Sequence, residues 1–154
     1  MKAASRMLKE YNTIFKENEK VYRDAIRLVG LPDTAFWILY ALRDADGPLT
    51  QRDIININFL PPQTVNSALK KLQAEGYVVL RGTDDRRRKQ VCLTAQGEAL
   101  ARRTADRVMQ MEEAAAAGLT AEEQAEFLRL FQKYTDLLKH NLTELQGGTY
   151  DEQL

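Results

Sequence analysis

Four polar side chains, Gln63, Asn66, Ser67 and Lys70, are spaced so that they share one face of a helix. The Gln and Asn amides donate and accept hydrogen bonds at the same time, which is what recognition of an adenine edge in the DNA major groove requires. A polar stripe is also typical of surface helices in general. The stripe therefore indicates a candidate nucleic-acid contact without establishing one.

Four consecutive cations, Arg86, Arg87, Arg88 and Lys89, follow this helix. They end the turn-rich segment GTDDRRRK, which separates two short apolar and β-branched runs, YVVLR at 77–81 and QVCLT at 90–94. This arrangement predicts a β-hairpin with a basic tip. A basic tip is commonly a solvated turn, but cations are also the side chains that bind phosphate. The helix and the hairpin together favour a winged helix-turn-helix.

The helix that carries the polar stripe has clear predicted ends. Pro61 and Pro62 favour a first helical turn, because proline has no N–H to leave unpaired and its φ is already helical. Gly76 fits the left-handed residue that ends a helix. A separate apolar stripe also has helical spacing: Val65, Ala68, Leu69 and Leu72. We therefore expect a helix over 61–74 that buries one face and exposes another.

Two shorter helices precede this one. The segment AFWILYAL, within a helix over 33–44, is apolar nearly all round, so this helix should be central to the core. Thr50 and Asp53 then form a capping-box pattern for a short third helix. We expect that helix to bury Ile54 and Ile57.

Further amphipathic helices are predicted towards both ends of the chain, over 3–29, over 95–117 and from 121 onward. The first and last carry wide apolar stripes. A compact DNA-binding unit does not need such helices at both termini, but a homodimer can interlock them and bury their stripes. The last residues, 147–154, are expected to form a disordered tail.

Length and composition fit one domain. The chain has 154 residues, with 22 Lys and Arg against 22 Asp and Glu, so its formal net charge is zero. The cations are concentrated instead, since Arg81 to Lys89 contains five of them and only two acids. One cysteine excludes a disulfide framework, and no apolar run approaches the roughly 20 residues of a membrane span. We expect a cytoplasmic protein that does not enter a membrane.

The motifs of residues 30–100 resemble the MarR family of bacterial transcriptional regulators. FWILYALRDADGPLTQRDI is similar to that family's second and third helices, PQTVNSALKKLQAEGYV to its recognition helix, and DDRRRKQVCLTAQGEAL to its D-x-R wing signature followed by V-x-L-T-x-x-G. The resemblance implies a mainly α fold with a small β-hairpin wing (α+β). It also implies a homodimer that binds an inverted-repeat operator in double-stranded DNA, usually as a repressor released by a small molecule.

The resemblance also divides the chain, which it treats as a single domain over 1–154. A winged helix-turn-helix lobe would occupy 32–94, and dimerisation helices would occupy 1–30 and 95–146, followed by the tail. The family contacts the major groove at the positions of Gln63, Thr64, Asn66, Ser67 and Lys70. Its wing corresponds to Asp85, Arg86, Arg87, Arg88 and Lys89, with Arg87 in the minor groove and Asp85 holding the wing arginines.

Two further features follow from the resemblance. The family's recognition helix commonly begins with a Ser or Thr cap, but Leu60-Pro61-Pro62 stands here instead, so Thr64 is the nearest hydroxyl for a phosphate. The family's effector pocket, for a small aromatic or amphipathic molecule, would be lined by Tyr11, Phe36, Trp37 and Tyr40. Core packing explains the same aromatics without a ligand, and the sequence leaves both interpretations open.

Catalytic chemistry is not indicated. His140 lies in the acidic last helix with no Ser, Cys or second His nearby, so we predict no enzyme, metal site or cofactor. Cys92 leaves redox sensing open. The alternative to DNA binding is a winged-helix module that docks another protein. That alternative would not need four clustered cations, and it would favour large apolar anchors on the helix face.

Overall fold

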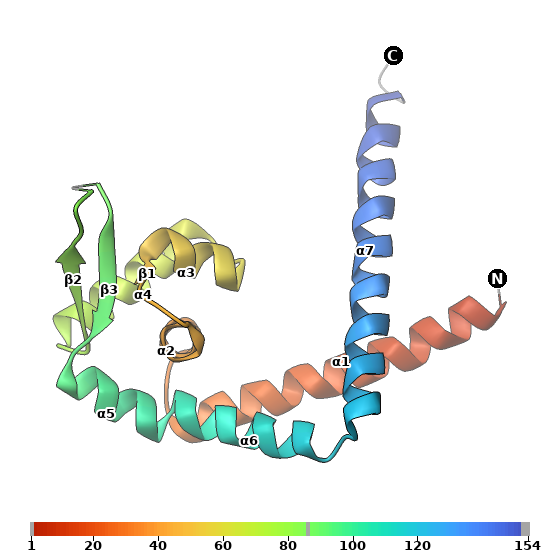
Figure 1. Ribbon diagram of the computed structural model, residues 1–154. Helices are drawn as coiled ribbons and strands as arrows, with labels where there is room; N and C mark the ends of the chain where they lie inside the picture. Colours follow the sequence, from red (N-terminus) through yellow and green to blue (C-terminus); the bar gives the residue numbers. More distant parts are fainter. Residues whose placement is uncertain (1, 86, 152–154) are drawn as a thin grey trace. The chain divides into compact units, whose positions relative to one another are not determined.

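The computed structural model describes residues 2–85 and 87–151, and it is mainly helical with one small sheet (Figure 1). This confirms the predicted fold class. The helices are α1 (Lys2–Val29), α2 (Asp33–Asp44), α3 (Gln51–Asn58), α4 (Pro62–Ala74), α5 (Ala95–Arg103), α6 (Ala105–Ala117) and α7 (Ala121–Asp151). The strands are β1 (Leu49–Thr50), β2 (Val78–Gly82) and β3 (Lys89–Leu93). The chain divides into two compact units, Met1–Gln110 and Met111–Leu154.

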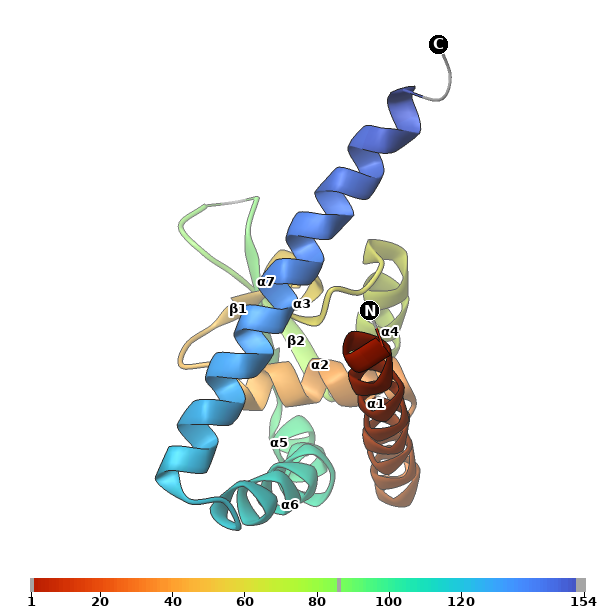
Figure 2. The same cartoon turned by 90° about the vertical axis from the view of Figure 1, so that its right-hand side faces the viewer.

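α2 is the centre of the first unit, as its apolar sequence predicted. It lies between α3 and α4 on one side and α5 on the other (Figures 1 and 2). Ala35 and Ile38 belong to a core cluster with α3, α4 and the sheet, while Phe36 and Leu39 belong to a second cluster with α1, α5 and α6. One helix therefore contributes to both clusters, which ties α3 and α4 to α5.

α4 has the amphipathic pattern predicted for it. The helix begins at Pro62, with Pro61 as its N-cap. Val65, Leu69 and Leu72 are buried, each at most 4% exposed. Burial of such a side chain contributes roughly 1.5–3 kcal/mol. The apolar face therefore holds α4 on the core while its polar face remains in solvent.

A Schellman motif ends α4. Gly76 has φ +81°, a conformation that favours glycine. The Gly76 N–H donates to the Gln73 carbonyl at 3.1 Å, and the Tyr77 N–H donates to the Leu72 carbonyl at 2.9 Å. The chain thereby turns directly from α4 into β2, as the sequence predicted.

The sheet is antiparallel, with strand order β1-β3-β2. β2 and β3 form the predicted hairpin, each displaced by one residue from the predicted runs 77–81 and 90–94. β1 was not predicted. It pairs Leu49 with Val91 and Thr50 with Gln90, and two residues are too few to show a periodicity. This pairing ties the start of α3 to the hairpin.

α5 begins against the turn that ends α4. The Thr94 hydroxyl accepts from the Gly97 N–H at 3.0 Å and donates to the Gly76 carbonyl at 2.6 Å. A Cβ at Gly97 would lie 1.9 Å from the Tyr77 carbonyl oxygen, so a side chain does not fit there. The base of the hairpin and the first turn of α5 are therefore fixed together.

The single helix predicted over 95–117 is wrong, because two helices, α5 and α6, meet at Thr104. Thr104 has φ −127° and ψ −86°. It is 1% exposed, and its hydroxyl donates to the Leu100 carbonyl at 2.6 Å. A threonine hydroxyl bonded to the carbonyl four residues earlier competes with the backbone ladder and bends a helix.

Arg43 of α2 binds both of these helices. Its Nε and Nη2 donate to Asp106 Oδ1 and Oδ2 at 2.7 and 2.6 Å, and its Nη1 donates to Glu98 Oε2 at 2.7 Å. Hydrogen bonding to the Arg43 guanidinium, together with its charge, holds the pKa of the Asp106 carboxyl below its ordinary value. The three charged groups thereby lock α2 to α5 and α6.

α3 buries only one of the two isoleucine side chains that were predicted to be buried. Ile54 is fully buried, as expected, but the expectation for Ile57 is wrong, because its side chain is 51% exposed. Ile55 packs against the core instead. α3 ends one residue after Ile57, at Asn58, and Phe59 takes a left-handed conformation (φ +51°) that turns the chain towards α4.

The C-terminal part of α1 packs into the first unit. Ala25 and Ile26 are buried in the second core cluster, and Tyr22 and Val29 pack against it. Residues 3–21 are exposed, apart from half-buried Tyr11. Their exposed large apolar side chains are Met7, Leu8, Ile14, Phe15 and Val21.

In the second unit, α7 begins at the predicted capping box. The Thr120 hydroxyl accepts from the Glu123 N–H at 3.1 Å, and Glu123 Oε2 accepts from the Thr120 N–H at 2.9 Å. The large apolar residues of α7 are 47–70% exposed: Phe127, Leu128, Leu130, Phe131, Leu137, Leu138, Leu142 and Leu145. Helical backbone continues through Gly147, where the tail was predicted to start, to Asp151, and residues 152–154 lie outside the described residues.

Among the described residues, no single helix is both long and apolar enough to cross a membrane. α1 and α2 satisfy the length and composition criteria only when taken together, across a bend of 91°. The apolar residues of α2 that contribute to this result lie in the core of the first unit.

Candidate nucleic-acid interface

The predicted groove-contact residues lie on the solvent-exposed side of α4. Gln63, Thr64, Ser67 and Lys70 are exposed. Asn66 is half-buried, and its Oδ1 accepts a long hydrogen bond, 3.4 Å, from Gln51 Nε2 of α3. With its oxygen directed at α3, the Asn66 amide can offer its NH₂ group to a base edge.

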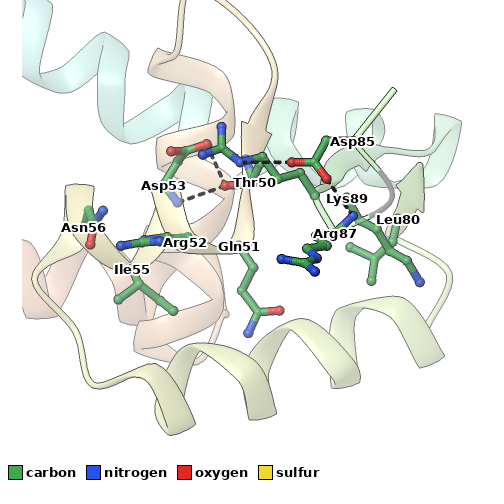
Figure 3. Close-up of a pocket in the computed structure, with 11 residues that line it drawn as sticks. Thr50, Gln51, Arg52, Asp53, Ile55, Asn56, Leu80, Asp85, Arg87 and Lys89 are labelled. Carbon is green, nitrogen blue, oxygen red and sulfur yellow. Dashed lines mark hydrogen bonds and ion pairs between the residues drawn. The ribbon is translucent and has the colours of Figure 1, made fainter. Parts of the chain in front are cut away.

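Gln51 is a functional candidate that sequence reasoning missed. It is the first residue of α3, and its side chain extends towards α4 (Figure 3). Its partner Asn66 is 15 residues away on another helix, so no local spacing could have indicated the pair. Gln51 therefore can orient the Asn66 side chain, and it adds a second amide beside the polar face of α4.

Asp85 organises the tip of the hairpin. Its Oδ1 accepts from the Arg87 N–H at 3.0 Å, and its carbonyl accepts from the Arg88 N–H at 2.9 Å. Its Oδ2 also lies 3.9 Å from Arg88 Nε. Thr83 Oγ1 lies 2.8 Å from the Arg88 carbonyl oxygen, which closes the turn. Arg86, predicted as part of the wing, lies outside the described residues.

A cleft of about 700 Å³ separates the start of α3 from the hairpin (Figure 3). Its walls include the cations Arg52, Arg87, Arg88 and Lys89 and the two carboxylates Asp53 and Asp85. Arg52 was not predicted as a contact, because one cation near a helix start is common and gives no signal. Cations thus outnumber carboxylates in the cleft.

Both carboxylates of the cleft already have internal partners. Asp53 Oδ2 accepts from the Thr50 N–H at 2.8 Å and from its hydroxyl at 2.7 Å. These two hydrogen bonds, with smaller contributions from the charges of Arg88 and Arg52, hold the pKa of Asp53 below its ordinary value. Asp85 is engaged in the turn of the hairpin.

The cations of the cleft are correspondingly free to bind an external anion. Among the described residues, Arg52, Arg87 and Lys89 form no ion pair, whereas Arg88 has only the long contact with Asp85. The cleft adjoins the polar face of α4, because Gln51 lines the cleft and its side chain also bonds Asn66 of α4. The arrangement can hold phosphates in the cleft while amides on α4 contact bases.

The four aromatic residues predicted to line an effector pocket form two groups, one on α2 and one on α1. The Trp37 ring centroid lies 5.0 Å from that of Phe36 and 5.4 Å from that of Tyr40. Tyr11 stacks on Phe15 at 5.9 Å. Phe36 is fully buried, whereas Trp37 and Tyr40 are half-buried. The role of these four residues in binding an effector stays a prediction.

Neither Cys92 nor His140 is among the residues that line the cleft. Cys92 is half-buried in β3 and pairs with Val79, while Val91 beside it is buried in the core. His140 is exposed on α7. Within the described part of the chain, no group of three or more His, Cys, Asp or Glu side chains is placed to hold a metal ion.

The amino-acid sequence is similar to those of known transcriptional regulators. A model described as the MarR family matches residues 29–89. The uncharacterized HTH-type transcriptional regulator YwoH of Bacillus subtilis (strain 168) is 30% identical over 105 residues, which are 68% of this chain and 76% of YwoH.

Solved structures with the same fold include NMB1585, a MarR family regulator from Neisseria meningitidis, which is 23% identical with a TM-score of 0.76 over 90% of this chain and 97% of that one. The S. aureus MepR–DNA complex is 21% identical, with a TM-score of 0.63 over 84% and 96% of the two chains. BpsR of Bordetella bronchiseptica, whose DNA binding is regulated by 6-hydroxynicotinic acid, is 23% identical, with a TM-score of 0.61 over 83% and 91%. At these identities the structures show a shared fold.

Proposed function

The chain belongs to the MarR family of transcriptional regulators, and from this premise we propose that it is a cytoplasmic, homodimeric repressor that binds an inverted-repeat operator in double-stranded DNA. A small molecule releases it from the DNA. The observation that carries the proposal is the exposed amide-bearing face of α4 beside a cation-lined cleft.

The two parts of this surface have different tasks. The major groove is about 12 Å wide and admits an α-helix, so α4 enters it with Gln63 and Asn66 facing base edges. Thr64, Ser67 and Lys70 contact bases or the adjoining phosphates from the same face. The cations of the cleft and of the hairpin bind phosphates of the DNA backbone, and Arg87 reaches the minor groove. MepR, which shares this fold, is known in complex with DNA, which supports this role.

The exposed apolar faces of α1 and α7 support the homodimer. Large side chains such as Ile14, Phe131 and Leu142 are 64%, 47% and 53% exposed. Apolar stripes of this length mark a surface that another chain covers. A two-fold dimer presents two copies of α4, which matches an inverted repeat with half-sites about one helical turn apart.

Release by a small molecule is supported by fold and by local chemistry. BpsR, which shares the fold, is regulated by 6-hydroxynicotinic acid. Half-buried Trp37 and Tyr40, with Phe36 and Tyr11, supply the kind of aromatic surface that binds small ligands. We propose that these four residues contact the effector.

A protein-docking module remains the alternative function, and one observation favours it. Ile57 and Phe59 are 51% and 93% exposed at the turn that leads into α4, so apolar side chains stand near the recognition face. The polar face of α4 itself carries no large apolar anchor. Binding to DNA and binding to a protein differ in their dependence on salt.

The test is selection of DNA by the purified full-length protein. Random and genomic fragments retained by the protein are sequenced, and sedimentation gives its mass in the same buffer. We expect enrichment of an inverted repeat and a mass of about two chains. Retention of fragments without a common sequence, or a monomer at micromolar concentration, would contradict the proposal.

A further inference from the structure

Phe59 is the most exposed large apolar side chain in the described part of the chain. It lies in the turn between α3 and α4, and it is 93% exposed. Leu60, the next residue, is half-buried and packs against the core cluster that holds α4. The turn therefore buries part of one apolar side chain and leaves its neighbour almost entirely in solvent.

The backbone of Phe59 also has a conformation that phenylalanine rarely adopts. Its φ is +51°, and among the described residues no other residue except glycine has a positive φ. This left-handed region is unfavourable for a residue with a Cβ, and asparagine tolerates it better than phenylalanine does. The preceding residue, Asn58, uses its amide locally, donating to the Ile54 carbonyl at 3.1 Å. A small polar residue at position 59 would therefore suit the turn better than phenylalanine does.

Phe59 lies just before the end of α4 that carries the first proposed base contact. Pro61 is the N-cap of this helix, Pro62 is its first residue, and both are exposed. The proposed base contact Gln63 follows Phe59 by four residues. Four residues span at most about 14 Å, which is the length of about four base pairs at 3.4 Å each. An α4 helix that places Gln63 at a base edge therefore brings Phe59 within reach of the same half-site.

The chemistry of this segment suits a base edge better than a phosphate. No residue from Ile54 to Leu69 carries a charge, so Phe59 has no neighbouring cation in the sequence to bind a phosphate. The apolar group in the major groove is the C5-methyl of thymine, and phenylalanine is one of the side chains that contact it. A protein partner fits less well, since Ile57 and Phe59 together fall well short of the roughly 800 Å² per partner that stable interfaces bury.

We propose that Phe59 packs on the C5-methyl of a thymine in each half-site of the operator, and so favours thymine at that position. The inference rests on the DNA-binding function proposed above. It adds an apolar contact to the amide contacts of α4. The contact removes the exposed ring and the methyl group from water, which is favourable.

Replacement of thymine by uracil tests this contact, because uracil lacks only the methyl group and pairs in the same way. The operator selected by the unmodified full-length protein is synthesised with uracil at each thymine in turn, together with its dyad-related position. At one such pair, within about four base pairs of the Gln63 contact, binding should weaken roughly fourfold per half-site, or about fifteenfold for the pair. Phe59→Asn should bind the thymine operator more weakly by a similar factor or more, and should lose nothing further when uracil is placed there.

Further variants separate this contact from effects on folding. Phe59→Tyr retains the ring and should keep most of the discrimination between thymine and uracil. Leu28→Asn, the matched control, removes an apolar side chain that is 85% exposed on α1, and it should leave the discrimination unchanged. Phe59→Asn should be at least as resistant to urea as the unmodified protein, because asparagine tolerates the left-handed backbone.

The methyl contact is excluded if the unmodified protein and Phe59→Asn discriminate equally between thymine and uracil at every position, even if Phe59→Asn lowers the affinity for the operator. A lower urea midpoint for Phe59→Asn would overturn the inference in another way, because the ring would then serve the fold. If the unmodified protein selects no operator at all, the proposed function fails, and the inference about Phe59 fails with it.

Discussion

α4 and α7 are both amphipathic helices, but only α4 buries its apolar stripe. Val65, Leu69 and Leu72 of α4 are at most 4% exposed, whereas Phe131 and Leu138 of α7 are 47% and 49% exposed. α4 is held by α2 and α3 on one side, so its remaining free surface is polar. α7 leaves apolar surface exposed in the single chain.

The two helices therefore expose different chemistry, in line with the different partners that we propose for them. A polar face on a well-packed helix offers hydrogen bonds at fixed positions, which suits base edges. A long exposed apolar stripe gains free energy by being covered, which suits a second copy of the chain. Changes to α4 and its surroundings should therefore alter DNA binding, and changes to α7 should alter assembly.

The largest expected effect is that of salt, which should weaken DNA binding through α4 but not dimerisation through α7. Raising salt from about 50 to 200 mM should weaken operator binding roughly a thousandfold or more, if the dimer neutralises about six to ten phosphates. The proposed dimer contact through α7 is apolar and does not depend on charge, so sedimentation should give the same mass at both salt concentrations. Titrations across this range measure the slope, and a flat slope would favour the protein-docking alternative.

Matched leucine truncations test the buried and exposed stripes directly. Leu69→Ala should lower the free energy of unfolding by about 2–5 kcal/mol, because it leaves a cavity in a packed core, while sedimentation still shows a dimer. Leu138→Ala should raise the dimer dissociation constant, measured by sedimentation on dilution. If Leu138→Ala leaves the dissociation constant unchanged, the α7 stripe is not the dimer contact.

Ion pairs in the two units should also differ in how much they contribute to the free energy of unfolding. Asp106 has a lowered pKa because Arg43 binds its charged form, so its contribution is present above about pH 4 and is lost as pH falls through the folded pKa. Asp106→Asn should cost about 1.5–3 kcal/mol at pH 7, and the difference from the unmodified protein should shrink towards pH 3. Urea unfolding at both pH values measures this. Glu126→Gln, in the exposed pair with Arg129 on α7, is the control and should change stability little.

Substitutions of the α4 amides and of the hairpin cation Arg87 should affect DNA binding in different ways. Asn66→Ala or Gln63→Ala should relax base preference by about 1–3 kcal/mol at two dyad-related positions, with little change on random DNA. Arg87→Ala should lower affinity for operator and A·T-rich random DNA alike, because the minor groove carries little sequence information. Titrations against the operator, its point mutants and random duplex measure both. If both amide variants keep the full base preference, α4 is not the recognition helix.

The smallest expected effect concerns Gln51. Gln51→Ala should relax preference at the base contacted by Asn66 by about 0.5–1.5 kcal/mol, the net value of one hydrogen bond. In an Asn66→Ala background the same change should have no further effect at that base. An additive loss in the double variant would show that Gln51 acts independently of Asn66.

Features that depend on neighbours along the chain could be predicted from the amino-acid sequence. Helix starts at Pro62 and at the Thr50 and Thr120 capping boxes, and the end of α4 at Gly76, were all correctly placed. Each is set by hydrogen bonds or dihedral limits within a few residues, so local residue types are sufficient. The same is true of the hairpin and of the buried stripe of α4.

Features that join distant residues could not be predicted, because they depend on how the elements pack in space. The Gln51–Asn66 bond and the Arg43–Asp106 pair each bring together different elements of the fold. The exposure of Ile57 and the break at Thr104 likewise depend on what packs nearby. Periodicity states which face of a helix is apolar, but whether that face is covered, and by what, is set by the packing of other elements in space.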